Sequence, residues 1–505
     1  MTNILHDALF APHAERDAPV LHLPDGGCVT YAAFLAQAAR FGHVLVRAGL
    51  SPGDRLAAQV PKCAEALALY AACVQAGVIF LPLNTGYTVE EVRYFLENSG
   101  AGMLVCEPGR AEALAPLAQG RGAVLHTLGA DGTGTLMAEA AAMPGRFDPV
   151  PRGPDDLAAF LYTSGTTGRS KGAMLSHENL RSNAVVLADL WRFTSDDVLL
   201  HALPIFHTHG LFVATNITLA AGGAMIFLPK FDADSMIAAM PRATAMMGVP
   251  TFYTRLLDDR RLTPEVTAGM RLFVSGSAPL LAETHARFEA RTGHRILERY
   301  GMTETNMNTS NPYDGERRPG TVGLPLPGVE MRITDPDTGA EVAPGAVGLI
   351  EVRGPNVFKG YWQMPERTAA ELREDGFFIT GDLGRQDRDG YLEIVGRDKD
   401  LVISGGYNIY PKEIEAVLDD QPGVLESAVI GVPHPDFGET PVALIVAAPG
   451  ATPDLDAIAA ELRTVLAGYK RPRDLLVIDA LPRNTMGKVQ KNILRERYRD
   501  RFATA

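Results

Sequence analysis

Short apolar runs alternate with amphipathic stretches through most of the chain. Between residues 30 and 110, helical periodicity at 31–48, 63–75 and 89–97 alternates with short apolar runs at 55–59, 78–83 and 103–106. Runs of this length, bounded by glycine, proline or polar residues, are typical of buried strands. The succession of strand and helix predicts parallel α/β structure.

The pattern changes twice further along the chain. Residues 111–151 predict a weaker helix–strand–helix segment, and the α/β rhythm then returns in a helix at 184–191 and strands at 198–203, 224–228, 246–249 and 272–275. Glycine and proline become frequent over 320–396, where 329–333 and 348–352 alternate as exposed strands do. From about residue 400, helices at 411–418 and 455–466 and strands at 425–432, 442–447 and 475–478 predict a compact unit. We therefore expect an α/β protein with two α/β subdomains, a β-rich subdomain and a small α+β C-terminal domain.

Length and charge narrow the function classes. A chain of 505 residues favours two or more domains, and a net charge of −13 argues against wholesale nucleic-acid binding. The four cysteines, Cys28, Cys63, Cys73 and Cys106, lack metal-site spacing and are expected to be reduced, buried thiols. The N-terminus lacks a signal-peptide pattern, and no apolar run reaches membrane-spanning length. We expect a cytoplasmic enzyme with no nucleic-acid or membrane partner.

A Gly/Thr/Ser segment, residues 162–172, lies between two apolar runs, 157–161 and 173–176. Its backbone amides, hydroxyls and cations suit the oxygens of a polyphosphate, and its glycines allow close approach. The members that carry this chemistry are Thr163, Ser164, Gly165, Thr166, Thr167, Gly168 and Lys171. A P-loop does not fit, because no glycine directly precedes the lysine and no helix directly follows it. A helix is expected only near Asn179, with Ser176 as its N-cap. A polar surface loop is the plain alternative, but the strand before the loop and its cationic end favour phosphate.

Five later stretches carry further candidate chemistry. Small residues at 275–280 would let a flat ring lie against the backbone. Tyr300 offers a face for a nucleobase, Thr303 a hydroxyl for phosphate and Glu304 an oxygen ligand for Mg²⁺. Asp382 follows a strand and a glycine, where a carboxylate can accept ribose hydroxyls. Residues 396–400 form a charged run, and a turn-rich segment at 482–488 presents one lysine. Each has a structural explanation when taken singly, as a turn residue, a solvated charge run or a surface lysine.

In this order and spacing, the motifs resemble those of the acyl-adenylate-forming superfamily of acyl-CoA synthetases, adenylation domains and luciferases. The resemblance covers nearly the whole chain, with one departure at Ser170, where such families usually carry proline. It implies that a substrate carboxylate attacks the α-phosphate of ATP with Mg²⁺, and that a thiol, usually of coenzyme A, then attacks the acyl adenylate. It also implies an N-terminal domain over 1–397, a hinge at 398–399 and a mobile C-terminal lid over 400–505.

The resemblance implies residue roles by position. Besides the loop from Thr163 to Lys171, ATP would contact Ser277, Ala278, Pro279, Glu298, Tyr300, Gly301, Met302, Thr303, Asp382, Arg397 and Lys488. The residues expected to be catalytic are Lys488, His207 and Glu304, with Glu304 and Thr167 at the metal. Lys399 would be the hinge, and Ser404, Gly405, Gly406 and Tyr407 would line the channel for coenzyme A.

Arg299 bears on the choice of acid. An unpaired arginine beside an apolar pocket would be costly, whereas a second carboxylate on the substrate would pair with it. Ser277 and His207 are the expected neighbours. An internal ion pair of Arg299 with Glu298 or Glu304 remains the alternative. A metal site at His207 and His209 is disfavoured because no third ligand is evident.

Residues 275–279, 298–305 and 310–323 more closely resemble the malonyl-CoA synthetases. That resemblance implies conversion of malonate, ATP and coenzyme A into malonyl-CoA, AMP and pyrophosphate through malonyl-AMP, with methylmalonate as a second substrate. It also implies a protein acetyltransferase and deacetylase acting on Lys488. The alternatives are a synthetase for another small acid, such as oxalate, succinate or a hydroxycinnamate, and an adenylating module that forms no thioester.

Overall fold

The computed structural model describes residues 2–502 apart from 164–169, 405–406, 435–436, 467 and 485–486. The chain divides into two compact units. The first comprises Met1–Glu330 and Val352–Phe378, and the second comprises Met331–Glu351 and Ile379–Ala505. In the described residues, no helix is both long and apolar enough to cross a lipid bilayer.

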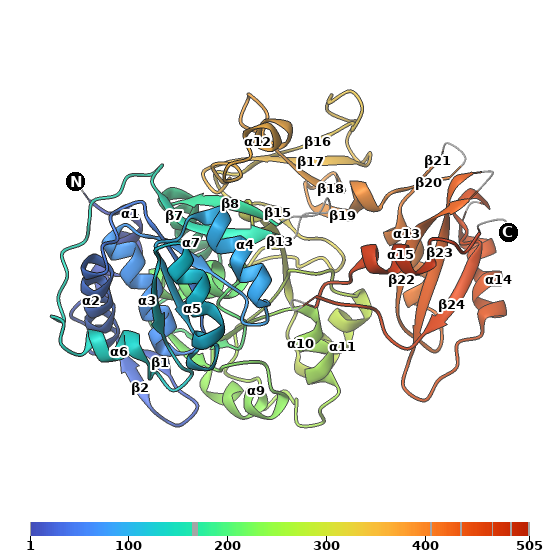
Figure 1. The fold of residues 1–505 in the computed structure, drawn as a ribbon. Helices are drawn as coiled ribbons and strands as arrows, with labels where there is room; N and C mark the ends of the chain where they lie inside the picture. Colours follow the sequence, from blue (N-terminus) through green and yellow to red (C-terminus); the bar gives the residue numbers. More distant parts are fainter. Residues whose placement is uncertain are drawn as a thin grey trace. The chain divides into compact units, whose positions relative to one another are not determined.

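One sheet of the first unit carries the Gly/Thr/Ser segment at its edge. Its strand order is β6-β5-β3-β4-β7-β8, and all neighbours are parallel except β7 and β8. The strands are β3 (Arg55–Gln59), β4 (Ile79–Pro82), β5 (Met103–Cys106), β6 (Val124–Thr127), β7 (Leu157–Thr163) and β8 (Lys171–Ser176). Alternate side chains, such as Ala57, Leu81 and Leu104, pack against α4 (Val89–Ser99) and α5 (Ala111–Gly120), which lie side by side in Figure 1. Burial of one face by these helices fixes the register of the sheet.

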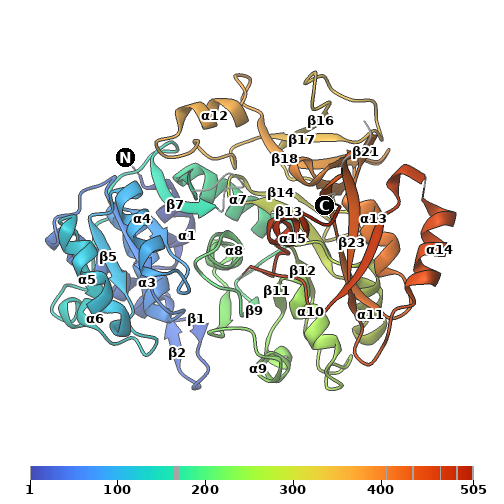
Figure 2. The same cartoon turned by 45° about the vertical axis from the view of Figure 1, so that its right-hand side comes forward.

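A second sheet in the same unit has the order β15-β14-β13-β12-β11-β9-β10-β1-β2. Its strands are β1 (Pro19–His22), β2 (Cys28–Thr30), β9 (Val198–His201), β10 (Ala224–Phe227), β11 (Ala245–Gly248), β12 (Leu272–Ser275), β13 (Leu297–Met302), β14 (Asn306–Ser310) and β15 (Leu324–Pro325). The strands from β9 to β13 are parallel, so their carboxyl ends share one edge. Apolar residues of β9–β12 pack against α9 (Ala233–Ala239), α10 (Pro250–Leu257) and α11 (Ala282–Thr292), and α10 and α11 are adjacent in Figure 2.

Further helices surround these sheets in the first unit. They are α1 (Ile4–Leu9), α2 (Tyr31–Arg47), α3 (Ala64–Ala76), α6 (Thr135–Ala140), α7 (His177–Leu190), α8 (Asn216–Ala221) and α12 (Pro365–Glu371). A π-helix, His209–Thr215, precedes α8. Ser176 caps α7 by accepting from the backbone of Asn179, so the predicted N-cap is confirmed.

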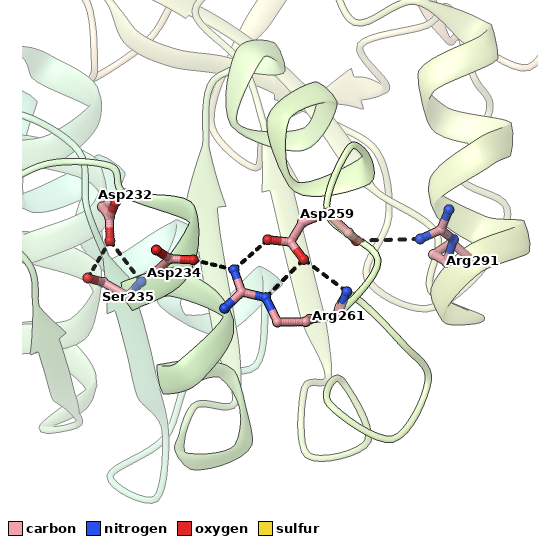
Figure 3. Close-up of polar contacts among 6 residues, drawn as sticks. All are labelled: Asp232, Asp234, Ser235, Asp259, Arg261 and Arg291. Carbon is pink, nitrogen blue, oxygen red and sulfur yellow. Dashed lines mark hydrogen bonds and ion pairs between the residues drawn. The ribbon is translucent and has the colours of Figure 1, made fainter.

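Charged side chains link the start of α9 to the exposed segment between α10 and α11, as Figure 3 shows. Asp232 caps α9 by accepting from the backbone N–H of Ser235 at 2.9 Å, and Arg261 pairs with both Asp234 and Asp259. Exposed pairs of this kind contribute roughly 0–1 kcal/mol each. We therefore regard this cluster as a structural feature of the surface.

The second unit holds two sheets. One has the order β16 (Glu330–Thr334), β17 (Gly348–Arg353), β18 (Phe378–Gln386) and β19 (Leu392–Arg397). The other has the order β21 (Tyr407–Ile409), β20 (Val402–Ser404), β23 (Gly438–Ala447) and β22 (Val424–His434), with β24 (Asp474–Ile478) also paired to β23. α13 (Pro411–Asp419) and α14 (Leu455–Val465) cover one face of the β22–β23 pair, and α15 (Lys491–Tyr498) covers the other.

The predicted α/β class and the helix–strand–helix segment over 111–151 are confirmed. The prediction of exposed strands in the β-rich part is wrong for β17, an inner strand between β16 and β18 whose residues are buried on both faces. Its one acidic residue, Glu351, tolerates burial by pairing with Arg332 at 2.8 Å. The prediction of four buried thiols is wrong for Cys28, which is exposed on the short strand β2.

Candidate active site

The two strands that flank the Gly/Thr/Ser segment, β7 and β8, pair antiparallel. Thr163, at the end of β7, pairs with Lys171, at the start of β8, so these residues close the loop. The Tyr94 hydroxyl of α4 donates to the Ser170 carbonyl at 2.7 Å and anchors the base of the loop. The prediction of a strand on each side of this segment is confirmed. Five predicted phosphate-binding residues lie outside the described residues: Ser164, Gly165, Thr166, Thr167 and Gly168.

Lys171 and Glu304 meet in one cluster. The Lys171 ammonium lies 3.4 Å from Oε1 of Glu371 and 4.1 Å from the centre of the Tyr361 ring. The Tyr361 hydroxyl lies 2.6 Å from Oε2 of Glu371 and 2.9 Å from Oε1 of Glu304. A candidate phosphate-binding cation therefore lies near a candidate metal-binding carboxylate.

Glu304 suits a magnesium ion that arrives with a nucleotide. The residue is only 5% exposed, and its carboxylate is a hard oxygen donor. In the described part of the chain, no three His, Cys, Asp or Glu side chains are grouped so that they could hold a metal. Mg²⁺ usually binds through one or two carboxylates together with substrate phosphates and water, and this donor set fits that pattern.

A second cluster forms where β12 and β13 end. These strands are parallel, with Ser275 beside Glu298, so residues 275–279 and 298–303 share one edge. Ser277 has a positive φ of 71°, and its hydroxyl lies 3.1 Å from Nδ1 of His209. A non-glycine residue in this conformation is strained, and such strain is concentrated at functional sites.

The structure places His209 beside Ser277. His209 begins the π-helix, a rare form often found at functional sites. His207 instead accepts the His209 backbone N–H on its Nδ1 at 3.4 Å. Burial and the nearby charge of Arg299 hold the pKa of His209 well below its usual value, so the ring is neutral.

Arg299 is a buried cation that has no ion-pair partner among the described residues. The residue is 3% exposed, and in the described part of the chain its Nε and Nη2 have no hydrogen-bond partner. The ion pair with Glu298 or Glu304 that the sequence left open is not formed. Burial lowers the pKa of Arg299 to about 9. The guanidinium lies flat on Gly276, where any Cβ would clash with it. The sequence predicted that a flat ligand ring would lie against the backbone of residues 275–280. At Gly276 that place is taken by the guanidinium of Arg299.

Other buried polar atoms near Arg299 also lack partners among the described residues. They include Nε2 of His209 and Oγ of Ser275, which ends β12. Buried polar groups are nearly always satisfied, so a group of such orphans indicates a ligand rich in hydrogen-bonding atoms. Because the strongest orphan is a cation, the ligand group that fits best is an anion.

The remaining predicted nucleotide residues surround these clusters. Glu298 and Tyr300 are buried on one face of β13, whereas Arg299 points to the other. A bulge between Tyr300 and Gly301 interrupts the alternation. Met302, Thr303 and Ala278 are half-buried, and Pro279 is exposed. Parallel pairing of β12 with β13 thus brings all these residues to one edge.

In the second unit, Asp382 and Arg397 are direct cross-strand partners on β18 and β19. Their side chains form an ion pair, with Nε of Arg397 2.8 Å from Oδ1 of Asp382. Thr380 accepts the backbone N–H of Asp382 at 3.1 Å. The pair presents a carboxylate and a guanidinium together, as a ribose site would require.

Lys488 follows a tight turn in the same unit. Asn484 accepts its backbone N–H at 2.9 Å. Although the residue as a whole is exposed, partial desolvation of its ammonium and the cations of Arg397 and Lys399 lower the pKa of Lys488 to about 8. Lys399 lies in a single 3₁₀ turn, Asp398–Asp400.

The predicted coenzyme A segment is only partly described. Ser404 ends β20 and pairs with Tyr407 at the start of β21. Gly405 and Gly406, and with them the loop that the sequence singled out, lie outside the described residues.

Comparison with known proteins agrees with this arrangement. The family model described as AMP-binding enzyme matches residues 10–362, and its C-terminal domain model matches residues 413–488. The chain belongs to the AMP-binding enzyme family. It is therefore an AMP-forming acid–thiol ligase, and the resemblance to the adenylate-forming superfamily is confirmed.

Individual relatives carry different names. The chain is 58% identical to ATP-bound MatB from Rhodopseudomonas palustris, with a TM-score of 0.98 over 99% of this chain and 100% of that one. It is 39% identical to a feruloyl-CoA synthase from Amycolatopsis sp, covering 97% of both chains. It is 36% identical to a malonate–CoA ligase from Arabidopsis thaliana, covering 83% of this chain and 74% of the relative. Membership of the family therefore does not by itself identify the acid that the enzyme activates.

Sequence reasoning missed Tyr361 and Glu371 and preferred His207 to His209. The contact between Lys171 and Glu371 joins residues 200 positions apart, so no local pattern marks it. The only sequence signal for His209 was its place in the same short His-Thr-His run.

Proposed function

We propose that this AMP-forming ligase is a malonyl-CoA synthetase. It would convert malonate, ATP and coenzyme A into malonyl-CoA, AMP and pyrophosphate through malonyl-AMP. The observation that carries the proposal is Arg299, a buried guanidinium with orphaned Nε and Nη2 atoms in the described part of the chain.

The far carboxylate of malonate would supply the missing counter-charge. Arginine and carboxylate form two parallel charge-assisted hydrogen bonds, which are stronger than neutral ones. The Ser277 hydroxyl and Nδ1 of His209 are 3.1 Å apart and share one proton, so this pair would leave one further donor for the carboxylate. An acid with an apolar tail, such as ferulate, would instead leave the buried charge unpaired, at a cost of several kcal/mol.

Other residues would serve the adenylation step. Lys488 would contact the attacking carboxylate and the α-phosphate as negative charge develops, and preorganised charges of this kind are a major source of catalysis. Asp382 and Arg397 would hold the ribose, and the hairpin loop with Lys171 would hold the outer phosphates. A bound Mg²⁺ at Glu304 would neutralise charge on those phosphates.

Thioester formation would use the second unit differently. Lys399 would be the hinge about which residues 400–505 turn between the two half-reactions, and residues 404–407 would line the thiol channel. Methylmalonate would be a second substrate. A protein acetyltransferase acting on Lys488 would remove its charge and silence adenylation, and a deacetylase would restore it.

The test is AMP release from a panel of acids with MgATP, with and without coenzyme A. We expect malonate to be fastest, methylmalonate next, and acetate, succinate and ferulate much slower. Faster turnover of ferulate or acetate would refute the assignment. Malonyl-CoA must also appear only when coenzyme A is present, because an adenylating module without thioester chemistry would release malonyl-AMP alone.

A further inference from the structure

We propose that Tyr361 and Glu371 form a bridge that fixes the phosphate-binding ammonium of Lys171 relative to the metal-binding carboxylate of Glu304. The two bridge residues would be positioning residues for the outer phosphates of ATP. This inference rests on the roles proposed above for Lys171 and Glu304.

The two ends of the bridge come from different sheets. Lys171 begins β8, at the edge of one sheet, whereas Glu304 follows β13 of the other. A third segment joins them through its backbone. The Phe358 N–H donates to the Glu304 carbonyl at 2.8 Å, and the Trp362 N–H donates to the Gly172 carbonyl at 2.8 Å. The segment from 358 to 362 therefore spans the gap between the two candidate ligands.

The bridging side chains are themselves held firmly. Tyr361 is 3% exposed, and its backbone N–H donates to the Thr368 hydroxyl at 2.9 Å. Its ring packs edge-on against Phe358, with centroids 4.8 Å apart. Glu371 pairs with Arg367 one turn earlier in α12 and also accepts from the Tyr361 hydroxyl. Such support is what precise placement of a ligand requires.

The charges around Lys171 suggest that Glu371 orients its ammonium towards phosphate and does not hold it away from the ligand. The ammonium of Lys171 is 3.4 Å from Glu371, a loose pair, and lysine has three N–H donors to share. Arg367 continues to balance Glu371 when Lys171 turns towards phosphate. The Tyr361 hydroxyl has one proton and reaches both carboxylates, so it links the positions of Glu371 and Glu304.

The experiment is calorimetric binding to the full chain of two ligands, AMP and the magnesium complex of an ATP analogue with a methylene group between its β and γ phosphorus atoms. Tyr361→Phe and Glu371→Gln should each weaken binding of the triphosphate about tenfold, the effect of losing one hydrogen bond to a charged group. Both should leave AMP binding unchanged, because AMP lacks the outer phosphates. Tyr31→Phe removes another buried hydroxyl bond, and Glu178→Gln another ion pair, so these variants serve as matched controls.

Three outcomes would overturn the bridge. Equal weakening of AMP and triphosphate would show a purely structural role. Tighter triphosphate binding would show that Glu371 sequesters Lys171. If Lys171→Ala and Glu304→Gln weaken the triphosphate but the bridge variants do not, the bridge alone fails. If Lys171→Ala and Glu304→Gln have no effect either, the proposed phosphate and metal site itself is wrong.

Discussion

Two arginines at neighbouring strands of one sheet, the half-buried Arg271 and the buried Arg299, have opposite surroundings. Arg271 lies directly before β12. Its Nε and Nη2 donate to the two carboxylate oxygens of Asp197, at 2.7 and 2.8 Å. Its third contact is the Trp191 carbonyl at 2.9 Å. Arg299, on β13, has no carboxylate partner in the described part of the chain. Arg271 is paired within the protein, whereas the described residues offer Arg299 no counter-charge.

The pKa shifts express the same difference. Burial lowers the pKa of Arg271, but the hydrogen bonds and charges of Asp197 and Tyr313 together outweigh it, so the net shift is upward. Burial lowers the pKa of Arg299 to about 9 with little opposition. A buried charge that the fold does not neutralise is therefore a stronger sign of a binding site than burial itself.

Removing Arg271 should affect stability most. Arg271→Met leaves Asp197, whose side chain is 5% exposed, without its cation, and breaking such a pair costs about 3–5 kcal/mol. Urea denaturation should show this loss, while the preference among acids stays unchanged. Arg287→Met, which breaks an exposed pair with Glu283, should cost less than about 1 kcal/mol. Equal losses in the two variants would remove the distinction drawn above.

Removing Arg299 should have the reverse profile. Arg299→Met should lower kcat/KM for malonate about 10²- to 10³-fold, since losing one partner of a buried ion pair costs about 2–5 kcal/mol. Butyrate, which has no second carboxylate, should be much less affected. The free energy of unfolding should not fall, because the variant removes an uncompensated charge. Parallel losses for malonate and butyrate would contradict the proposed role of Arg299.

Part of the site could be predicted from the sequence, because it depends on local pattern. Apolar runs and their punctuation located β12 and the two strands that flank the Gly/Thr/Ser segment, whereas β13 and the pairing of β18 with β19 were not predicted. The resemblance to a known family supplied the candidate roles. What the pattern could not supply was tertiary placement. Whether Arg299 pairs with Glu298 depends on which faces of β13 they occupy, a question of packing.

The same limit explains the missed residues. His207 and His209 differ by two positions, and only the π-helix turns His209 towards Ser277. Tyr361 lies 57 residues from Glu304 and reaches it through a segment that runs beside β8. Propensity and periodicity describe neighbours in the chain, so contacts across such distances remain invisible to them.

The charge of Lys488 is compensated less than that of Arg271 and more than that of Arg299. Its role should therefore be visible in the pH dependence of adenylation. Desolvation lowers the pKa of Lys488 most, the cations of Arg397 and Lys399 lower it further, and Asp382 and Asp400 compensate in part, which leaves a pKa of about 8. Adenylation should therefore fall as pH rises through about 8, by roughly tenfold per unit well above that value, because only the protonated lysine serves. The measurement is pyrophosphate release from malonate and ATP between pH 7 and 9.5.

Two controls sharpen the pH test. Thioester formation from premade malonyl-AMP should lack this decline, because that half-reaction does not use Lys488. Lys488→Arg should move the decline to higher pH, since an arginine stays protonated. A decline of equal midpoint in both half-reactions would assign the titration to another group.

The smallest expected effect concerns Ser277, a neighbour of the unpaired arginine. Ser277→Ala and Ser277→Gly both remove the hydroxyl, and each should raise KM for malonate about three- to tenfold, the range for losing one typical hydrogen bond. Their stabilities should differ, because φ is 71° here and glycine adopts that conformation without strain. Thermal denaturation should show the glycine variant to be more stable than the alanine variant by roughly 1 kcal/mol. If KM stays unchanged while stability follows this order, Ser277 shapes the backbone beside Arg299 and does not contact the acid.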